Sequence, residues 1–282
     1  MGTHFRATPG HVIPVLAALL LSGALTYGLH TSEAEIPAIT IFPETPSGAT
    51  LNASFFVVMM AVAATLIYVL VKYQKKRIVK YLMTVAVLFV TFFLLNWYSE
   101  LYATQLAPVI DVYGYGWIAL TGIVSALLLV GLNRGAQSIR VLSITIVGAL
   151  TGTFLGVSIP SMTAIVLLAA LAIYDLVSVY RGPIGKIAEM TDLDEFKGAV
   201  LTVGDLTIGM GDLVFYSMLT SNAMVNFGAL SYLGAFAGVL AGSYLGFKML
   251  ERREVFPGLP FAICIGLAAM IILSQLQIWL RI

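Results

Sequence analysis

Charge is the scarcest property of this sequence. Only 10% of the 282 residues are charged and 60% are hydrophobic, and the mean hydropathy is +0.97. Soluble domains carry about 25% charged residues, so this chain lacks the charge to cover a water-facing surface. The one cysteine, Cys264, excludes an internal disulfide framework and a metal cluster built on cysteines. The sequence therefore predicts an all-α polytopic membrane protein.

Nine apolar runs are each close to the roughly 20 residues that a helix needs to span hydrocarbon. We expect nine transmembrane helices in a single membrane domain, residues 1–282, because no remaining segment is long enough for a soluble domain. The first run could instead be a signal peptide, but no convincing cleavage site follows it. The runs lie at about 11–30, 54–72, 80–98, 116–132, 139–157, 160–180, 207–226, 228–248 and 258–280.

The basic residues are distributed very unevenly between alternate connections of these runs. One side receives 14 of the 15 Lys and Arg residues, which leaves only Arg281 for the other side. The positive-inside rule therefore predicts a cytoplasmic N-terminus and an outside C-terminus. The basic residues on the inner side are Arg6, Lys72, Lys75, Lys76, Arg77, Lys80, Arg134, Arg140, Arg181, Lys186, Lys197, Lys248, Arg252 and Arg253.

Glycines recur at every fourth position of the eighth run, as Gly234, Gly238, Gly242 and Gly246. This spacing lets the backbone of another helix approach closely. We expect a packing role for them.

Two carboxylates interrupt otherwise apolar runs, Asp175 in the sixth and Asp212 in the seventh. Each lies 14 residues from the outer end of its run, or about 21 Å at 1.5 Å per residue. The two aspartates are therefore expected at matching depth, in the cytoplasmic third of the bilayer. A charge at such a depth costs at least about 2.5–3.5 kcal/mol and usually faces a cavity with a function.

Two carboxylates close together in an apolar site do not ionise independently, and such a pair shares a proton. One group can then take a proton from water while the other donates one to the oxygen of a scissile carbonyl. Gly209 and Gly211 suit this chemistry, because without side chains they let a substrate backbone or water approach Asp212.

Several motifs around the aspartates resemble those of the GxGD intramembrane aspartyl proteases. The motifs are Tyr174-Asp175 in the sixth run, Gly209-x-Gly211-Asp212 in the seventh, and Phe215-Tyr216-Ser217 just after it. The family comprises the presenilins, the signal peptide peptidases and their microbial homologues. The small size is most similar to the archaeal presenilin homologues. The resemblance implies that Asp175 and Asp212 are catalytic, and that Tyr174, Gly209, Gly211 and Tyr216 shape the site.

A third motif departs from the family pattern. Where the family carries Pro-Ala-Leu at its last helix, this chain has Pro257-Gly258-Leu259-Pro260. Two prolines in four residues do not fit a regular helix interior, so we expect an irregular strip near the inner end of that helix. The resemblance implies that this strip helps to shape the active site and contacts substrate.

The sequence therefore predicts an intramembrane aspartyl endopeptidase that cleaves transmembrane helices of other proteins. In domain terms, helices one to six (about 11–180) supply Asp175, and helices seven to nine (about 207–280) carry the GxGD and PxLP motifs. The expected location is a cell membrane, as a multi-pass protein with the lipid bilayer and transmembrane substrates as partners. We expect no cofactor, metal or nucleic acid, and a homo-oligomer is left open.

An N-inside orientation is similar to that of presenilins and opposite to that of signal peptide peptidase. By that analogy, preferred substrates would have their N-termini outside. The alternative is a transporter or channel that uses the same aspartates to bind protons or cations. The absence of a discernible repeat and the location of both acids in one half of the chain argue against it.

Overall fold

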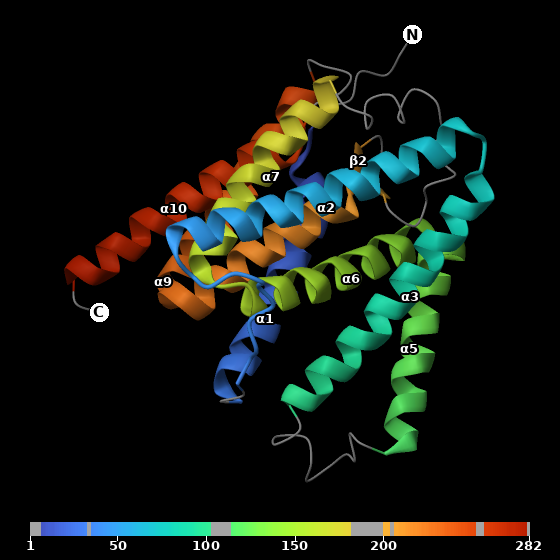
Figure 1. Ribbon diagram of the computed structural model, residues 1–282, viewed down its shortest axis with the longest axis horizontal. Helices are drawn as coiled ribbons and strands as arrows, with labels where there is room; N and C mark the ends of the chain where they lie inside the picture. Colours follow the sequence, from blue (N-terminus) through green and yellow to red (C-terminus); the bar gives the residue numbers. More distant parts are fainter. Residues whose placement is uncertain are drawn as a thin grey trace.

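The computed structural model describes residues 7–32, 35–102, 114–181, 200–203, 206–251 and 257–280. Most of these residues form helices, and the two strands form one small sheet (Figure 1). In chain order the elements are η1 (Pro9–Val12), α1 (Ile13–Thr31), α2 (Pro46–Lys72), α3 (Lys76–Leu101), α5 (Tyr115–Arg134), α6 (Gln137–Ser158), α7 (Ser161–Arg181), β1 (Val200–Val203), β2 (Leu206–Gly209), α9 (Met210–Leu250) and α10 (Leu259–Leu280).

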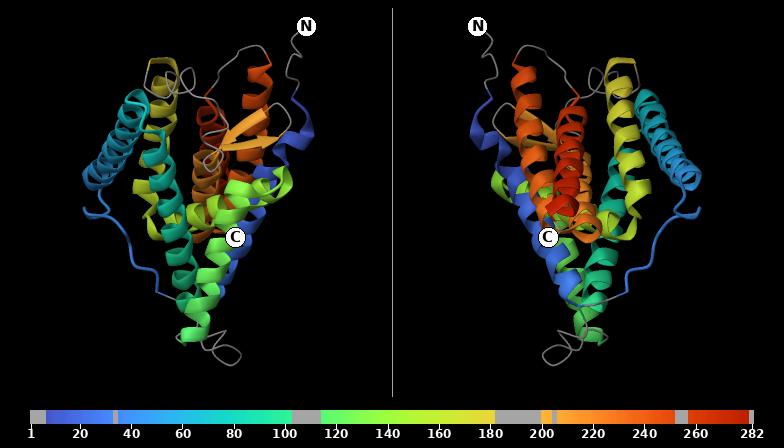
Figure 2. Two further views of the ribbon diagram at one scale, coloured as in Figure 1. Left: turned by 90° about the vertical axis from the view of Figure 1, so that its right-hand side faces the viewer. Right: turned by 90° about the vertical axis from the view of Figure 1, so that its left-hand side faces the viewer.

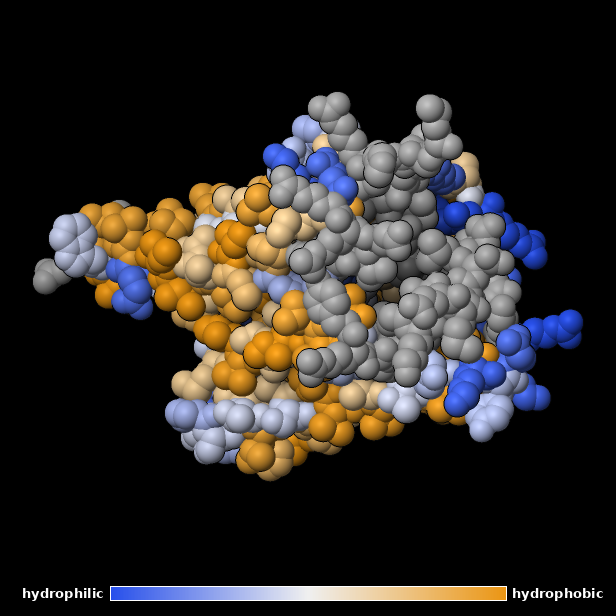
Figure 3. All heavy atoms as spheres, turned by 90° about the horizontal axis from the view of Figure 1, so that it is seen from above, coloured by the Kyte–Doolittle hydropathy of each residue, from blue (hydrophilic) through white to orange (hydrophobic). Residues whose placement is uncertain are grey.

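Eight helices within the described ranges are long and apolar enough to cross a membrane. Large apolar side chains also remain exposed on the outside of the bundle: on α2 these include Val58, Val62 and Leu66, which are 60%, 63% and 52% exposed. Figure 3 shows hydrophobic side chains along the flank of the molecule, with hydrophilic ones gathered mainly at one end. The protein is an all-α multi-pass membrane protein, as the composition predicted.

The longest element, α9, consists of two helical arms that meet at Gly228. The backbone there has φ 85° and ψ 178°, a conformation that is essentially restricted to glycine. The arms lie side by side (Figures 1 and 2). Leu219 of the first arm and Val239 of the second both lie beside Gly266 of α10. A Cβ added at Gly266 would lie 2.7 Å from the Leu219 side chain and 2.8 Å from that of Val239. The break falls where the seventh and eighth runs were expected to separate.

Three of the four predicted glycines, Gly234, Gly238 and Gly242, pack closely against α10. A Cβ added at Gly238 would lie 2.8 Å from the Cα of Gly266, and one at Gly242 would lie 2.6 Å from the Cα of Ala262. Only glycine permits such close backbone contact. This packing fixes α10 beside α9, and with it the segment that precedes α10.

A buried group of hydroxyl side chains, here called the hydroxyl layer, joins α1, α6 and the first arm of α9. It consists of Ser22 and Thr26 on α1, Thr153 on α6 and Ser221 on α9, all 0% exposed. Ser221 Oγ lies 2.7 Å from Ser22 Oγ, accepts from Thr26 Oγ1 at 2.9 Å and donates to Thr153 Oγ1 at 3.4 Å. These mutual hydrogen bonds satisfy hydroxyls that would be costly to bury alone.

One predicted helix start is wrong because polar residues precede the apolar run. α2 begins at Pro46 rather than near residue 54. Thr45 Oγ1 accepts a hydrogen bond from the N–H of Gly48 at 3.1 Å, so Thr45 is the N-cap and Pro46 occupies the first turn. Hydropathy locates the part of a helix within hydrocarbon, whereas capping residues set its end.

A β-hairpin that was not predicted precedes α9, so the seventh run is not helical at its first residues. β1 and β2 pair antiparallel, with Val200 opposite Gly209 and Val203 opposite Leu206, and α9 begins only at Met210. β-Branched residues are frequent in this stretch and favour strands, whereas Gly209 and Gly211 disfavour helix. Figure 2 shows the hairpin beside α6 and the start of α9.

Candidate active site

Asp175 lies on an otherwise apolar stretch of α7. Its neighbours Leu171 and Ala172 are buried, whereas Asp175 is half-buried. The carboxylate atom Oδ2 accepts a hydrogen bond from the backbone N–H of Leu259, the first residue of α10, at 3.2 Å. The first N–H groups of a helix have no acceptor within that helix. Asp175 therefore caps α10 from a neighbouring helix.

Asp212 lies in the first turn of α9, directly after the hairpin. The N-cap is Gly209, which has extended backbone, and a Cβ added there would lie 3.7 Å from Oδ2 of Asp212. The Asp212 side chain, at the third helical position, therefore lies beside the N-cap residue. The positive end of the helix dipole also favours an anion there. The carboxylate is thus placed by the helix start rather than by a continuous helix.

The two carboxylates come from different helices, α7 and α9, and both approach the segment that opens α10. The Gly258–Leu259 segment lies beside both. The N–H of Leu259 binds Asp175, and a Cβ added at Gly258 would lie 3.0 Å from Oδ2 of Asp212. A glycine at this position therefore leaves room for the second carboxylate beside the backbone.

Tyr216 contacts the same peptide group from the other side. It is 1% exposed, and its hydroxyl donates to the carbonyl oxygen of Gly258 at 3.0 Å. Tyr216 follows Asp212 by four residues, so both side chains lie on one face of α9. The site residues of α7, α9 and α10 are therefore connected through one backbone unit.

The irregular strip expected at Pro257–Pro260 is shorter than predicted. Only Pro257 and Gly258 precede the helix, and Leu259 and Pro260 already belong to α10. Proline has no N–H to donate, but the first turn of a helix has no acceptor for one. Pro257 and Leu259 are buried, whereas Gly258 and Pro260 are half-buried.

The remaining predicted site residues differ in their placement. Gly209 is half-buried beside Asp212, and Gly211 is exposed, with only Phe215 within 4.0 Å of an added Cβ. Both glycines thus leave space near the carboxylate. Tyr174 is half-buried on α7, and its hydroxyl makes no hydrogen bond to the described residues.

The backbone N–H of Leu259 is a functional group of the site that the sequence does not reveal. The hairpin that delivers Gly209 was not predicted, although its run of β-branched residues carried a signal. Leu259 was expected within the strip, but its N–H as the partner of Asp175 was not foreseen. That contact depends on tertiary structure, because residues 175 and 259 are far apart in the chain.

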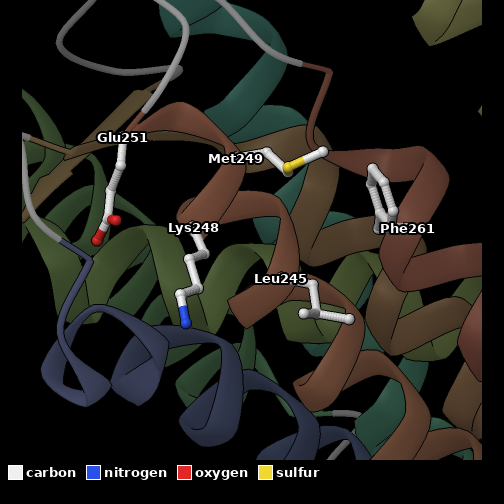
Figure 4. A pocket seen from close by; sticks show the side chains of 5 residues that line it. All are labelled: Leu245, Lys248, Met249, Glu251 and Phe261. Atoms are coloured by element: carbon white, nitrogen blue, oxygen red, sulfur yellow. The ribbon is translucent and has the colours of Figure 1, made fainter.

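A separate cavity of about 280 Å³ lies between the end of α9 and α10 (Figure 4). It is lined by Leu245, Lys248, Met249, Glu251 and Phe261, and neither aspartate contributes to it. Across the described ranges, no three His, Cys, Asp or Glu side chains are grouped to hold a metal ion.

The geometry of the pair suits acid–base chemistry on a neutral substrate. The Asp175 carboxylate accepts one backbone N–H, and within the described part of the chain neither carboxylate makes an ion pair with a basic side chain. Two interacting carboxyl groups of this kind can share a proton, so that one acts as base while the other acts as acid.

No protein-family model matches the sequence. A stretch of 120 residues is 31% identical to Presenilin-B of Dictyostelium discoideum and covers 39% of this chain. The chain spans 25% of the length of that curated relative, so the similarity concerns a limited part of it.

Two solved structures share the fold along nearly the whole chain. Both are of a presenilin family intramembrane aspartate protease, one in the C222 space group and one in the P2 space group. The first is 18% identical with a TM-score of 0.67 and covers 95% of this chain and 98% of its own. The second is 20% identical with a TM-score of 0.67 and covers 97% and 100%. The chain therefore has the fold that the sequence resemblance implied.

Proposed function

We propose that this chain is an intramembrane aspartyl endopeptidase that hydrolyses peptide bonds within transmembrane helices of other membrane proteins. The observation that carries the proposal is the meeting of Asp175 and Asp212 at the Gly258–Leu259 peptide. The fold shared with a presenilin family intramembrane aspartate protease supports it. The motifs around both aspartates support it as well.

In this mechanism the two carboxyl groups hold one proton between them. The ionised carboxylate takes a proton from a water molecule, whose oxygen attacks the scissile carbonyl carbon, while the protonated carboxyl donates its proton to the carbonyl oxygen. The tetrahedral diol then collapses: the C–N bond breaks, and the leaving nitrogen receives a proton. A helical substrate must unwind locally first, because its carbonyls are otherwise hydrogen-bonded within the helix.

The glycines and the proline segment serve substrate access in this proposal. The open space beside Gly211 admits water or an extended backbone next to Asp212. Pro257, Gly258, Leu259 and Pro260 form the facing wall and contact the substrate. Tyr174 borders the site on α7.

The proposed topology counts the two arms of α9 separately, which gives nine membrane spans in one membrane domain over residues 1–282. The N-terminus lies in the cytoplasm and the C-terminus outside, as the distribution of basic residues favours. Asp175 and Asp212 then lie toward the cytoplasmic side of a cell membrane. Substrates are transmembrane segments with their N-termini outside, and self-association of the protease is left open.

The test is cleavage of a model transmembrane substrate by purified protein in lipid, with the products identified by mass spectrometry. We expect the wild type to cut within the apolar segment and an Asp212→Ala variant to be inactive. A Glu44→Gln variant is the control. Glu44 accepts hydrogen bonds from Ser161 and Met162 at the start of α7, and among the described residues it makes no contact with either aspartate. Cleavage by Asp212→Ala would overturn the proposal. Ion flux that is lost in either Asp variant, without cleavage, would instead establish the transporter.

A further inference from the structure

The Gly258–Leu259 peptide uses both of its polar groups in contacts to the candidate site. Its carbonyl oxygen accepts from Tyr216 at 3.0 Å, and its N–H donates to Oδ2 of Asp175 at 3.2 Å. The hydrogen bonds therefore run in one line, from the Tyr216 hydroxyl through a single planar amide to the Asp175 carboxylate. Tyr216 and Asp212 are carried by the same helix, so this line joins α9 to α7 through α10.

We propose that Tyr216 is a positioning residue that holds Asp175 opposite Asp212 by clamping the Gly258–Leu259 peptide. This inference rests on the proposed endopeptidase activity. Tyr216 need not touch the substrate or the reacting water. Its hydroxyl fixes the rotation of the peptide plane, and that rotation aims the Leu259 N–H at Oδ2 of Asp175.

Two physical effects support this role. Hydrogen bonds in series polarise one another, so donation to the Gly258 carbonyl strengthens the Leu259 N–H as a donor. The two residues are also flanked by Pro257 and Pro260, whose rings fix their own φ, and Leu259 is the first residue of α10. A single further contact from Tyr216 is then enough to define the orientation of the peptide plane.

Other tyrosines of the protein show why this contact differs from ordinary packing. Tyr98 is 4% exposed and donates to the carbonyl of Leu150 at 2.8 Å, and Tyr232 donates to that of Leu19 at 3.2 Å. Those carbonyls lie inside α6 and α1, where neighbouring N–H groups bond within the helix. The Tyr216 contact instead ends on a carboxylate of the proposed pair.

The variant Tyr216→Phe removes the hydroxyl and keeps the ring that fills the buried space. We expect kcat for the model substrate to fall by about 10-fold or more, because misplacing a catalytic group by a fraction of an ångström is costly. KM should stay unchanged, because substrate binding does not use the hydroxyl. Tyr98→Phe is the matched control, since it also removes a buried hydroxyl-to-carbonyl bond, and its kcat should be that of the wild type.

Hydrogen exchange supplies a second readout that does not depend on activity. The segment Pro257–Pro260 contains only two backbone amide hydrogens, those of Gly258 and Leu259, because proline has none. In purified protein we expect Tyr216→Phe to speed exchange in this segment by about fivefold, as loss of one hydrogen bond predicts. Asp175→Ala should also speed it, whereas Tyr98→Phe should not.

The outcomes separate the two proposals. Wild-type kcat in Tyr216→Phe, or an equal fall in Tyr98→Phe, would overturn the positioning role while cleavage by the wild type still supports the protease. Unchanged exchange in Tyr216→Phe would overturn it independently of any substrate. A wild type that does not cleave, with Asp175→Ala and Tyr216→Phe both speeding exchange, would contradict the proposed function and leave the clamp established.

Discussion

Two consecutive stretches of the first arm of α9 use buried polar groups in opposite ways. At the start of this arm, Asp212 lies beside Gly209 and Gly258, and Tyr216 donates to the Gly258 carbonyl. One turn further, Ser221 belongs to the hydroxyl layer, where side chains of α1, α6 and α9 bind one another. The first stretch contains ionisable groups with few hydrogen-bond partners among the described residues, and the second contains neutral groups with several partners.

This difference implies that activity and stability are separable along one helix. Neutral hydroxyls that satisfy each other rigidify the packing of three helices. Carboxylates with few partners retain free lone pairs for water and substrate. Substitutions at the site should therefore lower the catalytic rate and leave the unfolding free energy almost unchanged. Substitutions around the hydroxyl layer should lower the unfolding free energy and leave the catalytic rate almost unchanged.

The largest expected loss of activity comes from a side chain introduced at Gly258. A Cβ there would lie 3.0 Å from Oδ2 of Asp212, so Gly258→Val displaces the carboxylate. We expect kcat/KM to fall by about 100-fold, since a misplacement of about 1 Å has that cost, while the unfolding free energy changes little. Steady-state cleavage and denaturant titration together measure this.

The control for Gly258 is Gly246, where an added Cβ meets only the Gly258 carbonyl oxygen, at 3.9 Å. Gly246→Ala should retain wild-type activity. If Gly258→Val cleaved as fast as the wild type, the close approach of Asp212 to this peptide would be irrelevant to catalysis.

A second substitution, Gly156→Ala, lies beside the hydroxyl layer and should lower the unfolding free energy. An added Cβ would lie 2.5 Å from the carbonyl oxygen of Met218 and 2.7 Å from the Cβ of Ser221, so α6 and α9 must separate. Overpacking of this kind costs about 1–3 kcal/mol of unfolding free energy. In Gly122→Ala, where the nearest neighbour is 3.9 Å away, we expect no such loss.

Activity per folded molecule should be retained in Gly156→Ala. A loss of kcat larger than the loss of folded protein would show that the two stretches are coupled, which contradicts their separation.

The smallest expected effect is that of Thr26→Ala in the hydroxyl layer. Thr26 Oγ1 bonds to the Ser22 carbonyl at 2.8 Å and to Ser221 Oγ at 2.9 Å. Its removal should cost about 1 kcal/mol. Thr65→Ala is matched, because Thr65 makes the same bond to the carbonyl four residues earlier but is exposed. Equal unfolding free energies for the two variants would mean that the interhelical bond contributes nothing.

Much of this architecture could be predicted from hydropathy and glycine pattern. The runs that became α1, α3, α5, α6, α7 and α10, and the break near Gly228, follow from the apolar length that a membrane requires. The starts of α2 and α9 could not be located in this way. Thr45-Pro46 was a capping signal that hydropathy does not weigh, and the four-residue strands of the hairpin were too short to stand out beside long apolar runs.

The site was predictable to the extent that chemistry was visible along the chain. An aspartate in an apolar run is conspicuous, so Asp175 and Asp212 were found from the sequence. Asp212, however, was expected inside a helix and lies in its first turn. The Gly258–Leu259 peptide could not be identified, because its role depends on three helices meeting rather than on side-chain identity.

The central claim is that Asp175 and Asp212 act as one catalytic unit. The most direct measurement compares the cleavage rates of Asp175→Asn, Asp212→Asn and the double variant on one transmembrane substrate. Groups that act as a unit are strongly non-additive, so we predict the same residual rate for all three. A single variant that retained substantial activity, or a double variant slower than both by the product of the single effects, would contradict a shared dyad.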